Sequence, residues 1–140
     1  MSEYSIEMVT SPQTFLDNEK RIRELLAKPI DRYGLYTVEG VVQKIINGGC
    51  SLWLAYKGSE RQIVGAFTVV VMHYELKKRL LIHQCGGEDV EEWIPEGWKV
   101  LRPWAIENGF DGAEIVGRKG WTKLFPEFNS DWVWLTYDLK

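Results

Sequence analysis

The chain has 140 residues, of which 45% are hydrophobic and 26% charged, a balance typical of one globular domain, so we expect a single domain over residues 1–140. The formal net charge of −3 gives no overall positive field that would attract nucleic acid, which argues against nucleic-acid binding. The longest apolar run, residues 66–72, is far shorter than the roughly 20 residues of a membrane helix, and residues 1–9 lack the pattern of a signal peptide, so a soluble intracellular protein is expected.

The N-terminal part of the chain predicts a short strand and then a helix. Residues 4–9 alternate between apolar and polar side chains, as in a half-exposed strand. Ser11 can cap a helix and Pro12 suits its first position. Apolar residues then recur at near-helical spacing, which predicts a helix over residues 12–28 that Pro29 ends.

A second helix and a three-stranded meander are expected next. Thr37 is another candidate cap, and the apolar residues from Val38 to Ile46 lie on one helical face. Gly48 and Gly49 suit the end of this helix, because glycine readily adopts the left-handed backbone found there. Three segments separated by polar turns, the middle one a long β-branched run, then predict antiparallel strands over residues 51–56, 62–74 and 79–85.

The last third of the chain returns to a helical pattern before two further strands. Apolar residues at helical spacing predict a helix over residues 89–108. Pro95 and Pro103 fall inside it, and because a mid-helix proline costs roughly 3 kcal/mol, we expect the helix to be broken or kinked. The remaining pattern predicts a strand, a short helix and a final strand over residues 110–116, 121–125 and 132–139.

Two stretches of the sequence resemble the GCN5-related N-acetyltransferase (GNAT) superfamily. Residues 52–71 (LWLAYKGSERQIVGAFTVVV) look like its second and third strands, with a polar turn before a hydrophobic pair and a glycine. Residues 105–114 (AIENGFDGAE) are similar to the end of its third helix and its fifth strand. The resemblance implies an α+β fold in which helices flank a central mixed, mostly antiparallel sheet.

In that family the pyrophosphate of acetyl-coenzyme A lies on a loop of pattern Gln/Arg-x-x-Gly-x-Gly/Ala at the start of the third helix. Gln84, Cys85, Gly86 and Gly87 match its first four positions, and would be the cofactor-binding residues of an active enzyme, but Asp89 stands in place of the small residue. Further carboxylates follow at Glu88, Glu91 and Glu92. Two like charges about 5 Å apart repel by roughly 3 kcal/mol at an effective dielectric constant near 20. We therefore expect this loop to hold no cofactor in the usual way, and its carboxylates to cap the helix themselves.

The resemblance also indicates where catalytic groups would lie. Many members of the family have a tyrosine acid in the short helix after strand five, but Thr122 falls at that position here, and a Thr hydroxyl is a far weaker acid than a phenol. Tyr137 is the candidate substitute. For the general base, His83 on the predicted fourth strand is the best candidate by position. Weaker candidates for the base are His73, Glu75 and Glu114.

The cysteines and tryptophans give two more expectations. Cys50 and Cys85 lie far apart without a CxxC pattern, so neither a disulfide framework nor a metal site is indicated, and both are expected to be buried free thiols. Six of the seven tryptophans fall between residues 93 and 134. In the resembled fold these residues border the cofactor cleft, so side chains such as Trp98 or Trp121 are predicted to narrow or fill it.

Three functions follow from these residues. The run Gly117–Trp121 (GRKGW) is similar to runs in degenerate GNAT-like proteins of tailed bacteriophages. Together with the altered loop, this favours a non-catalytic virion, assembly or interaction protein without cofactor, whose partner is another protein such as a virion component, in the bacterial cytoplasm or the virion. The alternative is an N-acetyltransferase that transfers acetyl from acetyl-coenzyme A to an amine. A third is an inhibitor that binds a host enzyme through the acidic stretch Glu88–Glu96.

Overall fold

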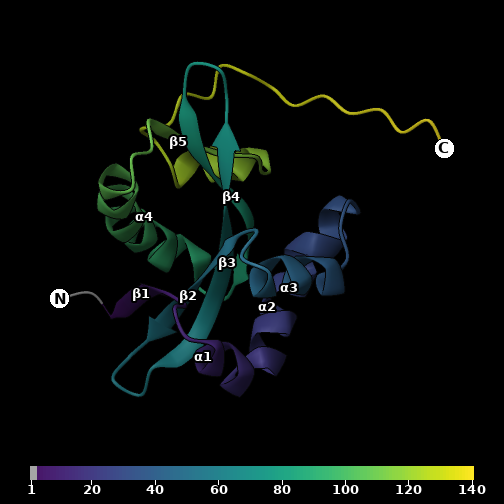
Figure 1. Cartoon of the computed structure of the whole chain (residues 1–140). Coiled ribbons are helices and arrows are strands. Elements are labelled where there is room, and N and C mark those ends of the chain that lie inside the picture. The colour runs from purple at the N-terminus through teal and green to yellow at the C-terminus, as the bar shows by residue number, and fades with distance from the viewer. Residues whose placement is uncertain (1–2) are drawn as a thin grey trace.

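The computed structural model describes residues 3–140 and places one five-stranded sheet between two layers of helices (Figure 1). The strands lie in the order β1-β2-β3-β4-β5, with antiparallel pairing from β1 to β4 and parallel pairing of β4 with β5. This is the mixed, mostly antiparallel sheet that the sequence predicts. The bounds are β1 (Tyr4–Met8), β2 (Ser51–Lys57), β3 (Gln62–His73), β4 (Lys78–Gly87) and β5 (Gly112–Ile115).

Two hydrophobic cores form because successive side chains of a strand point to opposite faces of the sheet. Helices α2 (Glu19–Tyr33) and α3 (Val38–Ile46) cover one face, and α4 (Val90–Glu107) covers the other (Figure 1). The α2-side core includes Ile22, Leu26, Ile30, Val42, Leu52 and Leu54. The α4-side core includes Ile6, Trp53, Phe67, Leu80, Trp93 and Leu101. No helix in the described part of the chain is both long and apolar enough to cross a membrane.

The first predicted helix is divided, and Pro29 does not end it. Ser11 caps α1 (Pro12–Asp17) as expected, its hydroxyl accepting from the Gln13 N–H at 3.2 Å. α2 then runs through Pro29 to Tyr33. A proline at this position cannot donate to the carbonyl of Leu25, four residues earlier, and that carbonyl lies against Gly86 of β4. The prediction was wrong because a contact with the sheet offsets the local cost of the proline.

α4 is one continuous helix, so it is not broken at its prolines; this contradicts one of the two expected forms, the break. Both Pro95 and Pro103 lie inside it. Each leaves one carbonyl without its helical donor, and these carbonyls belong to Glu91 and Lys99. Both residues are exposed, so water can bond to the carbonyls. The buried face of α4 keeps the apolar spacing that predicted the helix.

The end of the chain departs most from the expectation. Residues 132–139, predicted as a strand, have no regular structure, and residues 129–140 leave the body as an extended arm (Figure 1). An isolated strand is not stable without a neighbour, and in the described chain none pairs with this segment. The short helix is a 3-10 helix, η1 (Lys119–Lys123), and the strand before it is limited to β5.

Candidate functional site

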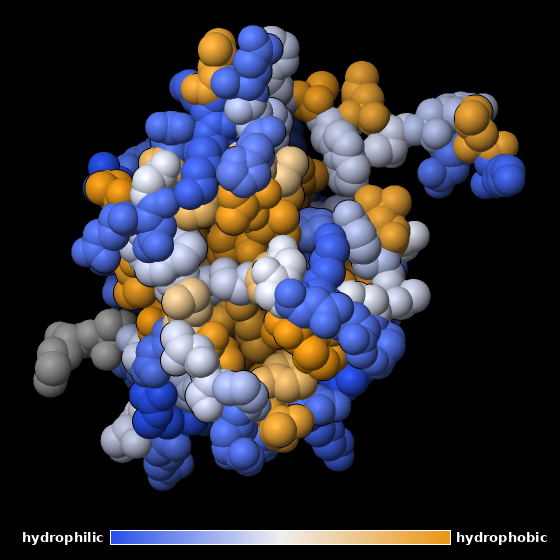
Figure 2. Space-filling view, in the orientation of Figure 1, coloured by the Kyte–Doolittle hydropathy of each residue, from blue (hydrophilic) through white to orange (hydrophobic). Residues whose placement is uncertain are grey.

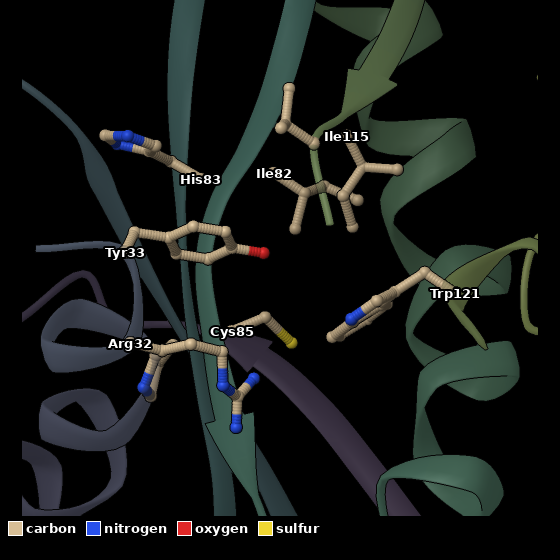
Figure 3. A pocket seen from close by; sticks show the side chains of 9 residues that line it. Arg32, Tyr33, Ile82, His83, Cys85, Ile115 and Trp121 are labelled. Atoms are coloured by element: carbon tan, nitrogen blue, oxygen red, sulfur yellow. The ribbon is translucent and has the colours of Figure 1, made fainter. Parts of the chain in front are cut away.

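A cleft opens where β4 and β5 part. The two strands pair from Arg79 and Gly112 as far as Ile82 and Ile115, where β5 ends while β4 continues. Residues from α2, β4, β5 and η1 line the gap beyond, as Figure 3 shows: Arg32, Tyr33, Ile82, His83, Cys85, Ile115 and Trp121. The site therefore combines one end of α2 with the diverging ends of two strands.

Side chains leave little space in this cleft. The Tyr33 hydroxyl, the Cys85 sulfur and the Trp121 indole point toward one another across it (Figure 3). The remaining cavity is about 10 Å³, comparable with the volume that one water molecule needs. Trp121 thus narrows the cleft as predicted. Trp98 does not, because its ring packs against Phe128 at a centroid distance of 4.9 Å.

The GRKGW run explains how Trp121 reaches the cleft. Its indole lies directly on Gly117, where a Cβ would come within 2.8 Å of the ring. The indole also stacks with Phe125, at a centroid distance of 6.2 Å and an interplanar angle of 18°. Gly117 is therefore the residue that lets the chain turn back and lay Trp121 beside β5.

Tyr33 and Arg32 were missed by the sequence analysis. The predicted helix ended at residue 28, so both fell in a loop and received no role. The signal that could have found them is Gly34, which ends α2 in the left-handed conformation (φ 66°) with its N–H bonded to the Ile30 carbonyl. A glycine at this place marks the end of the helix about one turn later than Pro29 would, so that Tyr33 lies in the last turn and reaches the cleft.

The cleft's titratable groups on β4 are held in their neutral forms. Burial raises the pKa of the Cys85 thiol to about 12, so it is protonated at neutral pH. The His83 imidazole is half-buried and meets the edge of the Tyr36 ring at a centroid distance of 4.9 Å. Burial, and then the Lys44 charge, lower the pKa of His83, so its neutral form is favoured. Both cysteines are free, as expected, but each residue is half-buried rather than buried.

The other candidate catalytic residues are not gathered around His83. Tyr137 lies on the C-terminal arm with 86% of its surface exposed. The Glu114 carboxylate accepts a hydrogen bond from the Tyr74 hydroxyl and lies 3.6 Å from Arg79. The Thr122 hydroxyl donates to the Lys119 carbonyl at 2.8 Å within η1. Of the predicted catalytic pair, only His83 lines the cleft.

The predicted cofactor loop is built into the sheet. Gly86 and Gly87 pair with Ala66 and Gly65 of β3, and a Cβ on Gly86 would lie 2.2 Å from the Leu25 carbonyl oxygen. Gln84 is buried, and its N–H donates to the Thr68 hydroxyl at 3.1 Å where the β3–β4 register shifts. Its side-chain oxygen is buried without a hydrogen-bond partner among the described residues. The glycines here let secondary elements approach one another.

Acidic side chains surround the start of α4 without capping it. Asp89 has a left-handed backbone (φ 54°) and its side chain makes no cap bond, which corrects the expectation. Its carboxylate instead accepts from the Lys57 ammonium at 3.1 Å and the Tyr4 hydroxyl at 3.2 Å. The Tyr4 hydroxyl also bonds to the Glu92 carboxylate, and Glu88 pairs with Arg21 at 2.9 Å. The bond from Lys57 lowers the pKa of Asp89, so this carboxylate is charged at neutral pH.

Comparison with known proteins gives the fold. Neither a family model nor a curated protein matches the sequence. A protein described as a probable acetyltransferase superposes with a TM-score of 0.73 at 13% identity, with 97% of each chain covered. An aminoglycoside acetyltransferase from an uncultured soil metagenomic sample gives 0.66 at 16% identity, covering 99% of this chain and 97% of its own. Glucosamine-6-phosphate N-acetyltransferase from Arabidopsis thaliana gives 0.67 at 10% identity, covering 98% and 99%. The chain therefore has the fold of the GNAT acetyltransferases.

Proposed function

We propose that this protein uses the GNAT fold without acetyl-coenzyme A and acts by binding another protein. The observation that carries the proposal is the filled cleft between β4 and β5, where Tyr33, Cys85 and Trp121 converge. In the resembled family this cleft is bordered by the elements that hold the cofactor. A fold does not fix a function, so a cleft closed by side chains is compatible with a purely structural or interaction role.

The volume of the cleft supports this proposal. The cavity of about 10 Å³ has room for about one water molecule and is therefore far too small for an acyl group with its attached chain. Entry of such a ligand would require the indole of Trp121 to give up its contacts with Gly117 and Phe125. The indole is half-buried, and its movement would expose the aromatic surface that these contacts cover.

The charges at the start of α4 also support the proposal that the protein acts without acetyl-coenzyme A. A pyrophosphate there would lie beside Asp89 and the nearby carboxylates of Glu88 and Glu92. The two cations close by are already paired, Lys57 with Asp89 and Arg21 with Glu88. Roughly 3 kcal/mol of repulsion for one unscreened close pair corresponds to about a hundredfold in affinity. The residues present are a poor fit for the cofactor's phosphates.

Calorimetric titration of acetyl-coenzyme A into the full chain tests the proposal. We expect no binding at millimolar ligand. One-to-one binding below 1 mM would overturn it and favour the alternative, an N-acetyltransferase with His83 as base. A Trp121→Ala/Asp89→Asn variant is the matched control, because it opens the cleft and removes one charge. If this variant binds acetyl-coenzyme A and the wild type does not, these two side chains are what prevents binding.

A virion or assembly role is the specific form of this function that the GRKGW resemblance implies. If the protein comes from a bacteriophage, mass spectrometry of purified particles tests that role directly. The expected result is a fixed number of copies in each particle. Absence from the particle would count against the virion role while leaving the cofactor question to calorimetry.

A further inference from the structure

The C-terminal arm, residues 129–140, keeps one aromatic contact with the body among the described residues. Figure 2 shows the arm projecting from the body with apolar side chains in solvent. Trp132 and Leu135 have 88% and 85% of their surface exposed, whereas Trp134 between them has 56% exposed. The difference arises because Trp134 meets Tyr33 at the end of α2, with ring centroids 6.2 Å apart. The arm is therefore fixed to the body at Trp134.

Tyr33 connects this contact to the cleft. It is the last residue of α2, and its hydroxyl points toward the Cys85 sulfur and the Trp121 indole (Figure 3). Trp134 is the one aromatic ring in contact with Tyr33 among residues 3–140. One side chain thus contacts the arm and also forms a wall of the cleft.

The wall that Tyr33 forms is placed at the end of a helix. Gly34 follows it in the left-handed conformation and ends α2, so Tyr33 lies in the last turn. The ends of elements open locally at smaller free energies than the core does. A ring that packs on Tyr33 from outside can therefore shift the balance between a closed and an open cleft.

We propose that the arm regulates access to the cleft between β4 and β5, because Trp134 packs on Tyr33 and holds this wall in its closed position. An aromatic pair is worth about two- to tenfold in an equilibrium constant. By linkage, a molecule that binds Trp134 should open the cleft, and a ligand that enters the cleft should release the arm. The inference does not depend on whether the cleft binds acetyl-coenzyme A, so the two proposals can fail separately.

The rate at which iodoacetamide modifies Cys85 measures how often the cleft opens. When opening and closing are fast relative to alkylation, this rate is proportional to the equilibrium constant for opening. We expect Trp134→Ala in the full chain to raise the rate about two- to tenfold at pH 8. Trp132→Ala is the matched control, because it removes an equally large side chain that is almost fully exposed, and it should leave the rate unchanged. Equal rates in the wild type and Trp134→Ala, or equal increases in the two variants, would overturn the proposal.

A second comparison tests whether the arm acts through Tyr33. Tyr33→Ala removes the wall itself and should also speed the modification of Cys85. In a Tyr33→Ala/Trp134→Ala variant, loss of the indole should cause no further increase, because its partner ring is already absent. A further increase as large as in the wild-type background would mean that the arm shields the cleft without Tyr33, and the proposal would fail.

Discussion

Gly86 lies where α2 touches β4, and its lack of a side chain lets the Leu25 carbonyl approach the strand. The ring of Pro29 is nearly as close, since a Cβ on Gly86 would lie 2.9 Å from it. A proline in the helix and a glycine in the strand are thus two halves of one contact. The local meaning of Pro29 in the sequence, a helix stop, no longer applies once the two meet.

We expect Gly86→Ala to lower the free energy of unfolding by about 1 to 3 kcal/mol, because the added methyl group overpacks the contact with the backbone of α2. Gly97→Ala is the matched control. Its Cβ would meet Ile6 at an ordinary 3.9 Å inside α4, so the helix preference for alanine should stabilise the protein by up to about 1 kcal/mol. Urea denaturation measures both, and equal effects of the two substitutions would contradict the contact.

The lowered pKa of His83 predicts that the free energy of unfolding falls as the pH drops. The pKa of this imidazole is lowered in the folded chain, chiefly by burial, from an ordinary value of about 6.5. Between the two pKa values the unfolded chain binds more protons, so the free energy of unfolding falls as the pH drops below about 6.5. Denaturation at pH 5 to 8 should show this slope in the wild type, and His83→Gln should reduce it. An unchanged slope would mean that His83 is solvated.

At the scale of elements, the cleft depends on how η1 sets Trp121 against β4 and β5. Because Cys85 points into the same space, its thiol reports on that closure (Figure 3). Trp121→Ala should open the cleft and return the pKa of Cys85 toward the ordinary value of about 8.5. We expect iodoacetamide at pH 8 to modify Cys85 at least about tenfold faster in the variant.

Cys50 is the internal control for this measurement. It lies in the chain before β2 and outside the cleft lining, so its own rate should not change. Mass spectrometry of the two cysteine peptides gives both rates from one sample. If Cys85 reacts equally fast in the wild type and the variant, Trp121 does not close the cleft.

Local signals predicted the elements well where they agreed with the tertiary structure. Thr37 caps α3 as expected, its hydroxyl accepting from the Gly40 N–H at 3.0 Å, and the turns of the meander lie where polar residues predicted them. The predictions fail where a contact between residues distant in the sequence determines the local structure. Pro29 remains helical because of β4, and β4 continues past its predicted end because Gly86 and Gly87 pair with Ala66 and Gly65 of β3. No pattern within α2 or β4 alone contains that information.

At the scale of the whole molecule, the body and the arm are separable. Neither hydrophobic core draws on residues 129–140, and the last aromatic residue of the body is Phe128, packed on Trp98. Deleting the arm should therefore leave a folded chain. Its thermal midpoint should stay close to that of the full chain, because the removed residues contribute to neither core. A shortened chain that melts far lower at every concentration would show that the arm belongs to the core.

The positions of the seven tryptophans predict two components in the intrinsic fluorescence of the protein. Five tryptophans belong to the α4-side core, where Trp93 is buried with its N–H bonded to the Glu88 carbonyl at 2.7 Å. The other two, Trp132 and Trp134, stand on the arm. Intrinsic fluorescence should therefore contain a short-wavelength component from the core and a longer-wavelength component that acrylamide quenches. A contact that covers the arm would shift the emission wavelength of the second component alone, while the emission of the core stays unchanged.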